Sequence, residues 1–179
     1  MISEKQRSAE AACEYVKDGM IVGLGTGSTA EFAVKKIGEL VRNGLSIRGI
    51  PTSDATKILA ESEGIPLIEF SETMFIDLTI DGADEIDANL NMIKGGGAAL
   101  LREKIVASAS REEIIIVNGS KLVQQLGTFP LPVEVIPFGW QVVFNQLESL
   151  QGNPELRLKQ GQPSVTDQGN FIVDCHFRK

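Results

Sequence analysis

The stretch that decides the fold is "IVGLGTGSTAEFAVKK", residues 21–36. It opens with a short apolar run that is typical of a buried strand, and glycines follow at positions 23, 25 and 27. Residues 26–44, which begin in this stretch and continue beyond it, have the pattern of a loop and then a helix. A strand, a glycine-rich turn and a helix in this order are the first half of a βαβ unit.

The same alternation of strand and helix continues along the chain. We expect further strands within 45–53, 65–70, 74–80 and 111–120, and further helices over 3–17, over 54–64 and after the glycines at 95–97. The predicted fold class is therefore α/β, with a Rossmann-like, largely parallel sheet and helices on both of its faces.

A change in amino-acid composition, to a proline-rich segment, predicts a domain boundary near residue 130. Pro130, Pro132 and Pro137 interrupt any helix in "GTFPLPVEVIPFGW". Beyond them we predict a helix over 141–152 and a hairpin over 165–177 that turns at "DQGN". We therefore expect a main catalytic domain over 1–129 and a smaller α+β domain over 130–179.

Composition excludes several classes of function. The chain has 42% hydrophobic residues and a formal net charge of −7, with no basic patch that would suit a nucleic acid. The start is charged, without a signal-peptide core, and no apolar run reaches membrane-spanning length, so we expect a soluble cytoplasmic protein. Cys13 and Cys175 do not have the spacing of a metal site or a disulfide framework. Because His176 is the single histidine, any acid–base catalysis must use carboxylates and lysines.

The first glycine loop is a candidate anion site. A helix start offers unpaired amides and the positive end of the helix dipole, and Thr26, Ser28 and Thr29 add hydroxyl groups. The spacing G-x-G-x-G matches neither the Walker loop nor the dinucleotide fingerprint. Ser28 and Glu31 also have the spacing of a capping box, so on this motif alone anion binding and simple capping are equally supported.

An acidic turn follows the strand predicted over 74–80. Its carboxylates are Asp81, Asp84, Glu85 and Asp87. Ligands of open α/β sheets bind beyond the carboxyl ends of the strands, so this turn is placed to meet a polar ligand. The spacing misses the EF-hand calcium pattern, and for an isolated acidic turn a solvated role is the commoner outcome.

A second glycine loop, "KGGGAALLREK" at 94–104, again precedes a helix. The neighbours of Glu103 at three and four residues on either side are Ala99, Leu100, Val106 and Ala107. None of them can form an ion pair, which favours a carboxylate aimed inward. A lone helical glutamate is nevertheless most often a solvated surface residue.

Six motifs in one order change the balance: "GLGTGSTA", "TSDAT", "DGADEID", "MIKGGGAALLREK", "GSK" and "FPLPVEVIP". Over essentially its whole length the chain resembles type A ribose-5-phosphate isomerase. The resemblance implies an aldose–ketose isomerase of the non-oxidative pentose phosphate pathway, acting on ribose 5-phosphate and ribulose 5-phosphate without metal or cofactor. It also leads us to expect a homodimer or homotetramer.

The resemblance also implies which residues do the work. The catalytic base falls on Glu103, which would carry a proton between C2 and C1 through a cis-enediolate, and further charged groups fall on Asp81, Asp84 and Lys94. Substrate binding falls on Thr26, Gly27, Ser28, Thr29, Asp81, Gly82, Ala83, Asp84, Lys94, Gly95, Gly96, Gly97 and Lys121. Family members usually continue for some tens of residues beyond "FIVDCHF", so we expect the small domain to be incomplete in this sequence.

Other functions on similar folds are less well supported. A sugar-phosphate sensor without catalysis would normally carry a DNA-binding helix-turn-helix, whereas here the first helix leads directly into the first strand. An amino-sugar phosphate deaminase needs a histidine in its active site, and His176 is the single histidine of this sequence. A coenzyme A transferase would need its glutamate as nucleophile and room for the coenzyme.

Overall fold

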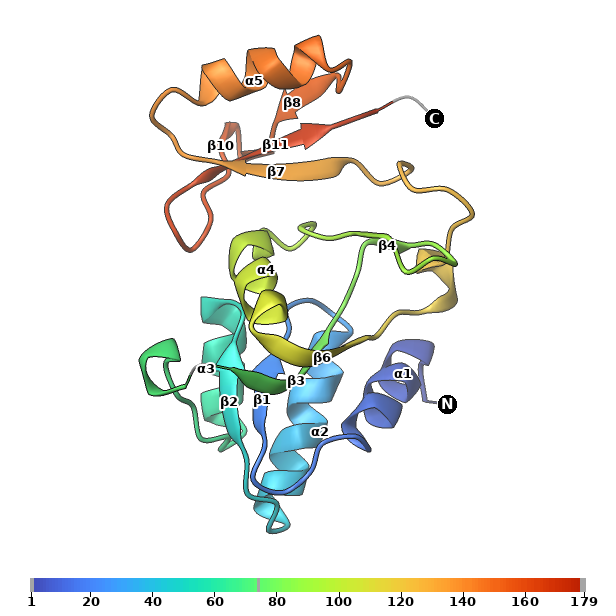
Figure 1. Cartoon of the computed structure of the whole chain (residues 1–179), viewed down its shortest axis with the longest axis vertical. Helices are drawn as coiled ribbons and strands as arrows, with labels where there is room; N and C mark the ends of the chain where they lie inside the picture. The colour runs from blue at the N-terminus through green and yellow to red at the C-terminus, as the bar shows by residue number, and fades with distance from the viewer. Residues whose placement is uncertain (1, 74, 178–179) are drawn as a thin grey trace. The chain divides into compact units, whose positions relative to one another are not determined.

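The structure is a computed structural model that describes residues 2–73 and 75–177. The chain forms two compact units, each described by itself below (Figure 1). The first unit comprises Met1–Gly82 and Leu101–Ser120, and the second comprises Ala83–Leu100 and Lys121–Lys179. A domain boundary at residue 130 stays a prediction.

A four-stranded parallel sheet is the centre of the first unit. Its strand order is β2-β1-β3-β6, from β1 (Ile21–Leu24), β2 (Arg48–Pro51), β3 (Ile76–Asp81) and β6 (Ser110–Ile115). All three pairings are parallel. The helices are α1 (Glu4–Cys13), α2 (Ala30–Arg42), α3 (Asp54–Ser62) and α4 (Leu100–Ser108). The predicted α/β fold with a largely parallel sheet is confirmed.

Helices cover both faces of this sheet because neighbouring strand residues point to opposite sides. Val22 and Leu24 of β1 pack with Leu78 of β3 and with the buried side chains of α1 and α2. On the opposite face, Val106 of α4 packs with Ile21 and the adjoining strands. The β1 strand is buried along its whole length, as expected for a central strand of a parallel sheet.

The strand predicted over 65–70 is wrong. Leu67 makes one parallel bridge with Gly49 at the edge of the sheet, and Phe70–Glu72 forms a short 3-10 helix, η1. Glu69 and Glu72 close a capping box at the start of this helix, with the Glu72 side chain accepting from the Glu69 amide at 3.0 Å. This local capping competes with continued pairing, so the apolar run leaves the sheet after one bridge.

A three-stranded antiparallel sheet is the centre of the second unit. Its order is β7-β11-β8, from β7 (Leu131–Val135), β8 (Pro154–Leu156) and β11 (Phe171–Cys175). Helix α5 (Trp140–Ser149) packs Phe144 and Leu147 against buried Val173. Two short pairs complete the unit: β4 (Glu85–Ile86) with β5 (Met92–Ile93), and β9 (Leu158–Lys159) with β10 (Gln162–Pro163).

The hairpin predicted over 165–177 is half correct. Its turn is present, because the Thr166 amide donates to the Asn170 carbonyl at 2.9 Å. The arm before the turn contributes a single bridge, Val165 to Phe171, and β11 pairs with β7 and β8 instead. β11 therefore pairs with strands that are distant in the sequence, and only one bridge joins it to the neighbouring arm of the hairpin. Within the described ranges, none of the helices has the length and apolar character to cross a membrane.

Candidate active site

Asp81 is built into the first glycine loop. The Asp81 side chain lies at the carboxyl end of β3 and is only 1% exposed. Its Oδ1 accepts hydrogen bonds from the amides of Thr26, at 3.0 Å, and Gly82, at 2.7 Å. A Cβ on Gly25 would come within 2.3 Å of the same oxygen, so the loop needs glycine there. A carboxylate that is buried and bonded in this way is not a solvated turn residue, and that alternative is wrong for Asp81.

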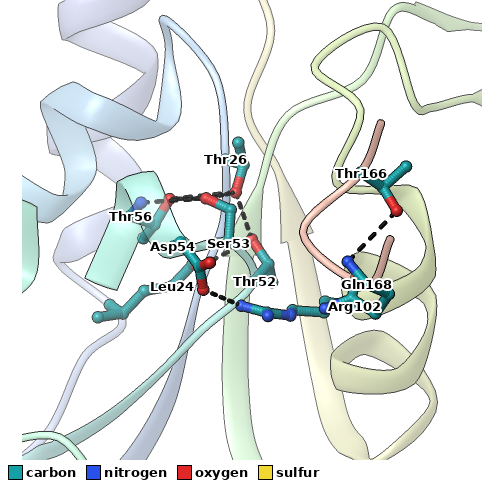
Figure 2. Close-up of polar contacts among 9 residues, drawn as sticks. All are labelled: Leu24, Thr26, Thr52, Ser53, Asp54, Thr56, Arg102, Thr166 and Gln168. Atoms are coloured by element: carbon teal, nitrogen blue, oxygen red, sulfur yellow. Dashed lines mark hydrogen bonds and ion pairs between the residues drawn. The ribbon is translucent and has the colours of Figure 1, made fainter. Parts of the chain in front are cut away.

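A cluster of hydroxyl groups fixes the loop from its other side (Figure 2). Thr26 Oγ1 lies 2.7 Å from Thr52 Oγ1, 2.8 Å from Ser53 Oγ and 3.1 Å from Thr56 Oγ1. Thr56 Oγ1 also donates to the Gly25 carbonyl at 3.0 Å. Thr52, Ser53 and Thr56 are buried. The Thr26 hydroxyl therefore serves the shape of the loop, while Gly27 and Ser28 are exposed at its tip.

The start of α2 differs from the capping-box interpretation. Its N-cap residue is Thr29, which makes no side-chain capping bond. Ser28 Oγ instead accepts a hydrogen bond from Lys5 Nζ of α1 at 2.7 Å. The capping-box alternative is therefore wrong, and the exposed tip of the loop has a cation beside it. Sequence reasoning missed Lys5, because no local pattern relates two residues that are 23 positions apart.

Glu103 is a buried carboxylate on α4. It is 5% exposed, and together with Val106 it forms the buried side of that helix. The prediction of an inward-facing glutamate is confirmed, and the solvated alternative is wrong. Burying a carboxylate costs free energy. The burial of Glu103 on the same side of α4 as Val106 therefore indicates a role in function and not in stability.

The second glycine loop is held by Asp84. The Gly96 amide donates to Asp84 Oδ2 at 2.7 Å, and the Asp84 amide donates to the Ile93 carbonyl at 2.8 Å. A Cβ on Gly96 would come within 2.5 Å of Asp84 Oδ1. Gly95 has a φ of +105°, a conformation that L side chains rarely adopt. Glycine at 95 and 96 is therefore required by backbone shape and by close approach.

The other two carboxylates of the acidic turn have structural partners. Glu85, which is 4% exposed, accepts from the amides of Gly127 and Phe129, both at 2.7 Å. Asp87 accepts from Asn91 and Asn89, and the side-chain hydrogen bond from Asn91 lowers the Asp87 pKa below its ordinary value. These contacts organise the loop at 127–129 and the turn at 87–91.

The two candidate lysines lie in the second unit. Lys94 follows β5 directly and is half-buried. Lys121 ends the short helix η2 (Gly119–Lys121), with its Nζ 5.9 Å from the centre of the Phe129 ring. The roles assigned to both stay predictions. Over the described part of the chain, His, Cys, Asp and Glu side chains do not gather in groups of three or more that could hold a metal ion.

The structure divides the predicted site residues between the two units. The loop at 26–29, Asp81, Gly82 and Glu103 belong to the first unit, and Ala83, Asp84, the loop at 94–97 and Lys121 belong to the second. The chain itself joins the two sets, because the acidic turn crosses from the first unit to the second between Gly82 and Ala83.

Comparison with known proteins identifies the family. The profile of ribose 5-phosphate isomerase A (phosphoriboisomerase A) matches residues 48–179. Ribose-5-phosphate isomerase A of Bacillus mycoides (strain KBAB4) is 52% identical over 177 residues, which cover 99% of this chain and 80% of the relative. The resemblance drawn from the sequence motifs is confirmed.

Solved structures agree. Ribose 5-phosphate isomerase A from Methanocaldococcus jannaschii superposes with a TM-score of 0.94 at 42% identity, covering 97% of this chain and 79% of that one. A D-ribose-5-phosphate isomerase in complex with phospho-erythronic acid gives a TM-score of 0.94 at 41% identity, with 97% and 78% covered. With a matching profile, a half-identical relative and a shared fold, the chain belongs to the ribose 5-phosphate isomerase A family.

Proposed function

We propose that this chain interconverts D-ribose 5-phosphate and D-ribulose 5-phosphate, because its relatives are named ribose-5-phosphate isomerases. The observation that carries the proposal is the buried Glu103 on α4 of a member of this family. The reaction belongs to the non-oxidative branch of the pentose phosphate pathway. The expected homodimer or homotetramer and the cytoplasmic location stay predictions.

Glu103 acts as the general base and then as the acid. Its carboxylate takes the proton from C2 of the open-chain aldose, which leaves a cis-enediolate, and returns a proton to C1. A second proton moves between the oxygens at C2 and C1, so that the carbonyl shifts from C1 to C2 and no electrons leave the substrate. Asp81 or Asp84 assists ring opening or carries that second proton.

Negative charge develops on the substrate oxygens during the transfer. Lys94 and amides of the second glycine loop stabilise it, as preorganised donors do at oxyanion sites. The Gly96 amide already donates to Asp84, so the amides of Gly95 and Gly97 are the better candidates. Of the three loop glycines to which the resemblance assigns substrate binding, Gly95 and Gly97 are therefore the proposed amide donors.

The substrate phosphate binds at the start of α2. Gly27 and Ser28 are exposed there, the helix dipole favours an anion, and Lys5 contributes a cation beside Ser28. Lys121 is the other candidate donor. The relative in complex with phospho-erythronic acid supports this class of ligand, because that molecule is also a phosphorylated sugar derivative.

Incubation of the full chain with ribose 5-phosphate tests the proposal. We expect ribulose 5-phosphate to accumulate to equilibrium, monitored by NMR. Phospho-erythronic acid should inhibit competitively, since a carboxylate resembles an enediolate in shape and charge. Binding of both compounds without any ketose would instead show a sugar-phosphate sensor.

A pair of lysine variants tests the oxyanion role. Lys94→Ala should lower kcat more than Lys104→Ala, because Lys104 lies on the exposed side of α4. Equal effects of the two substitutions would count against Lys94 as the group that meets the developing charge.

A further inference from the structure

The second glycine loop has an anchor that the sequence motifs do not contain. Arg157, between β8 and β9, donates through Nη1 to the Gly95 carbonyl at 2.9 Å and the Gly96 carbonyl at 3.4 Å. All three residues belong to the second unit. A cation that donates to a backbone carbonyl makes a stronger bond than a neutral donor does. The loop carbonyls are therefore attached to a side chain 61 residues or more along the chain.

The guanidinium of Arg157 is itself fixed. Its Nε donates to Asp174 Oδ2 at 2.8 Å and its Nη2 to Asp174 Oδ1 at 2.5 Å. Both side chains are only 16% exposed. Asp174 lies on β11, the central strand of the antiparallel sheet. Such a two-bond pair holds the plane of the guanidinium, so Nη1 is presented to the loop in one orientation.

The backbone of Arg157 is anchored as well. Its amide donates to the Ile172 carbonyl and its carbonyl accepts from the Ser164 amide, both at 2.8 Å. Both the backbone of Arg157 and its guanidinium are therefore held by hydrogen bonds. An exposed, flexible arginine could not fix the loop, whereas Arg157 links the loop to β11 through Asp174.

The contacts on the loop fix a peptide plane from two sides. In a trans peptide the carbonyl and the amide of one plane point in opposite directions. The plane between Gly95 and Gly96 has its carbonyl on Arg157 and its amide on Asp84. The carbonyl of the next plane also faces Arg157, so the Gly97 amide is turned away from the guanidinium. The Gly95 carbonyl also accepts from the Ala98 amide at 3.1 Å, and these contacts together restrict a run of three glycines that would otherwise allow many orientations.

We propose that Arg157 is a positioning residue for the isomerisation, which sets the direction of the Gly97 amide and the path of the chain after Lys94. The proposal rests on the proposed function. Donation from a cation to the carbonyl polarises the peptide group and strengthens its amide as a donor. Arg157 acts through the loop and not on the substrate, and Asp174 acts through Arg157.

Kinetics of Arg157→Lys test the proposal. Lysine keeps the charge but cannot hold both oxygens of Asp174 and the loop carbonyls together. We expect kcat to fall roughly 10- to 100-fold, with a smaller change in KM because the phosphate donors lie elsewhere. Asp174→Asn should act in the same direction. Arg42→Lys is the matched control, because Arg42 also contacts a carboxylate and a carbonyl, both of Glu63 at 2.8 Å, and it should leave kcat unchanged.

Chemical rescue separates positioning from general stability. Arg157→Ala should regain part of its kcat when methylguanidinium is added, and methylammonium at the same concentration should not restore it. Folding is checked by urea unfolding of each variant. If Arg157→Ala does not fold, Arg157→Lys and Asp174→Asn decide the question.

Hydrogen exchange supplies a readout that does not depend on the reaction. In Arg157→Lys the Gly96 amide should exchange roughly tenfold faster, a factor that corresponds to the loss of one charge-assisted hydrogen bond, while amides of β11 keep their protection. Faster exchange with an unchanged kcat, or no change in either, would overturn the proposal. An inactive parent protein would instead overturn the proposed function, and the exchange rates would still report whether Arg157 holds the loop.

Discussion

Asp84 Oδ2 accepts a hydrogen bond from the Gly96 amide at 2.7 Å, and this contact joins the acidic turn to the second glycine loop. Two motifs that are separated in the sequence thus form one local structure within the second unit. The contact leaves no room for a side chain, because a Cβ on Gly96 would lie 2.5 Å from Asp84 Oδ1.

Gly96→Ala should therefore impair the enzyme. The methyl group forces Asp84 or the loop to shift, and a displacement of about 1 Å in a catalytic site can cost on the order of 10²-fold in rate. We expect a fall in kcat of that size, measured as ketose formation from ribose 5-phosphate. Gly119→Ala is the control, since its Cβ would meet nothing closer than 3.9 Å. Similar losses in the two variants would show that the Asp84 contact is unimportant.

Glu103→Gln tests the general base. The amide retains the size of the side chain but cannot accept the C2 proton, so we expect kcat to fall by roughly 10²- to 10⁴-fold. The urea midpoint should stay near that of the parent. The second measurement is exchange of the C2 proton of ribose 5-phosphate with deuterated solvent. Exchange at the parent rate in Glu103→Gln, together with its loss in Asp81→Asn, would move the role of base to Asp81.

Thr26→Val should destabilise the first unit. Valine matches threonine in shape but leaves the hydroxyls of Thr52, Ser53 and Thr56 without their shared partner. We expect the free energy of unfolding in urea to drop by about 1–3 kcal/mol. Thr26→Ser retains the hydroxyl and should stay closer to the parent. A Thr26→Val protein as stable as the parent would mean that the cluster contributes nothing.

Cys13 should be unreactive in the folded protein. Its Sγ donates to the Ala33 carbonyl at 3.6 Å, and burial raises the pKa of the thiol from 9.0 to about 12. Alkylation by iodoacetamide at pH 8 should therefore be slow until urea unfolds the chain, because only the thiolate reacts. Rapid alkylation of Cys13 in the native protein, located by mass spectrometry, would contradict its burial.

The same thiol gives a pH dependence with a definite sign. Well below pH 9 it is protonated in both the folded and the unfolded chain, so it adds no slope. Between pH 9 and about 12 the unfolded chain loses the proton first, so the free energy of unfolding falls, by up to about 1.4 kcal/mol per pH unit. Cys13→Ala should show a shallower fall over this window. Identical slopes would mean that the thiol does not ionise later in the folded state.

Much of the first unit could be predicted from the sequence because its signals are local. The βαβ pattern around "IVGLGTGSTA" predicts the strand, the loop and the helix that the structure has, and the uncharged residues three and four positions from Glu103 favour the burial that it shows. The 65–70 stretch misleads because an apolar run cannot show that capping at Glu69 and Glu72 will end the pairing.

Contacts across long sequence distances could not be predicted. Lys5 with Ser28 and Arg157 with Gly95 depend on where whole elements pack, and no spacing rule applies to them. The four carboxylates of the acidic turn, from Asp81 at the end of β3 to Asp87, look equivalent as a motif. They separate only in the structure, where Asp81 serves one loop, Asp84 another, Glu85 a third and Asp87 its own turn.

The way the chain divides has a consequence for evolution and engineering. Because the chain leaves one unit for the other after Gly82, Leu100 and Ser120, the second unit is assembled from two separate lengths of sequence. A single gene segment therefore cannot duplicate, exchange or delete it. Recombination within this family should preserve the junctions at 82–83, 100–101 and 120–121 together, and a chimaera that replaces only the segment after Ser120 would inherit its Arg157 from one parent and its glycine loop from the other.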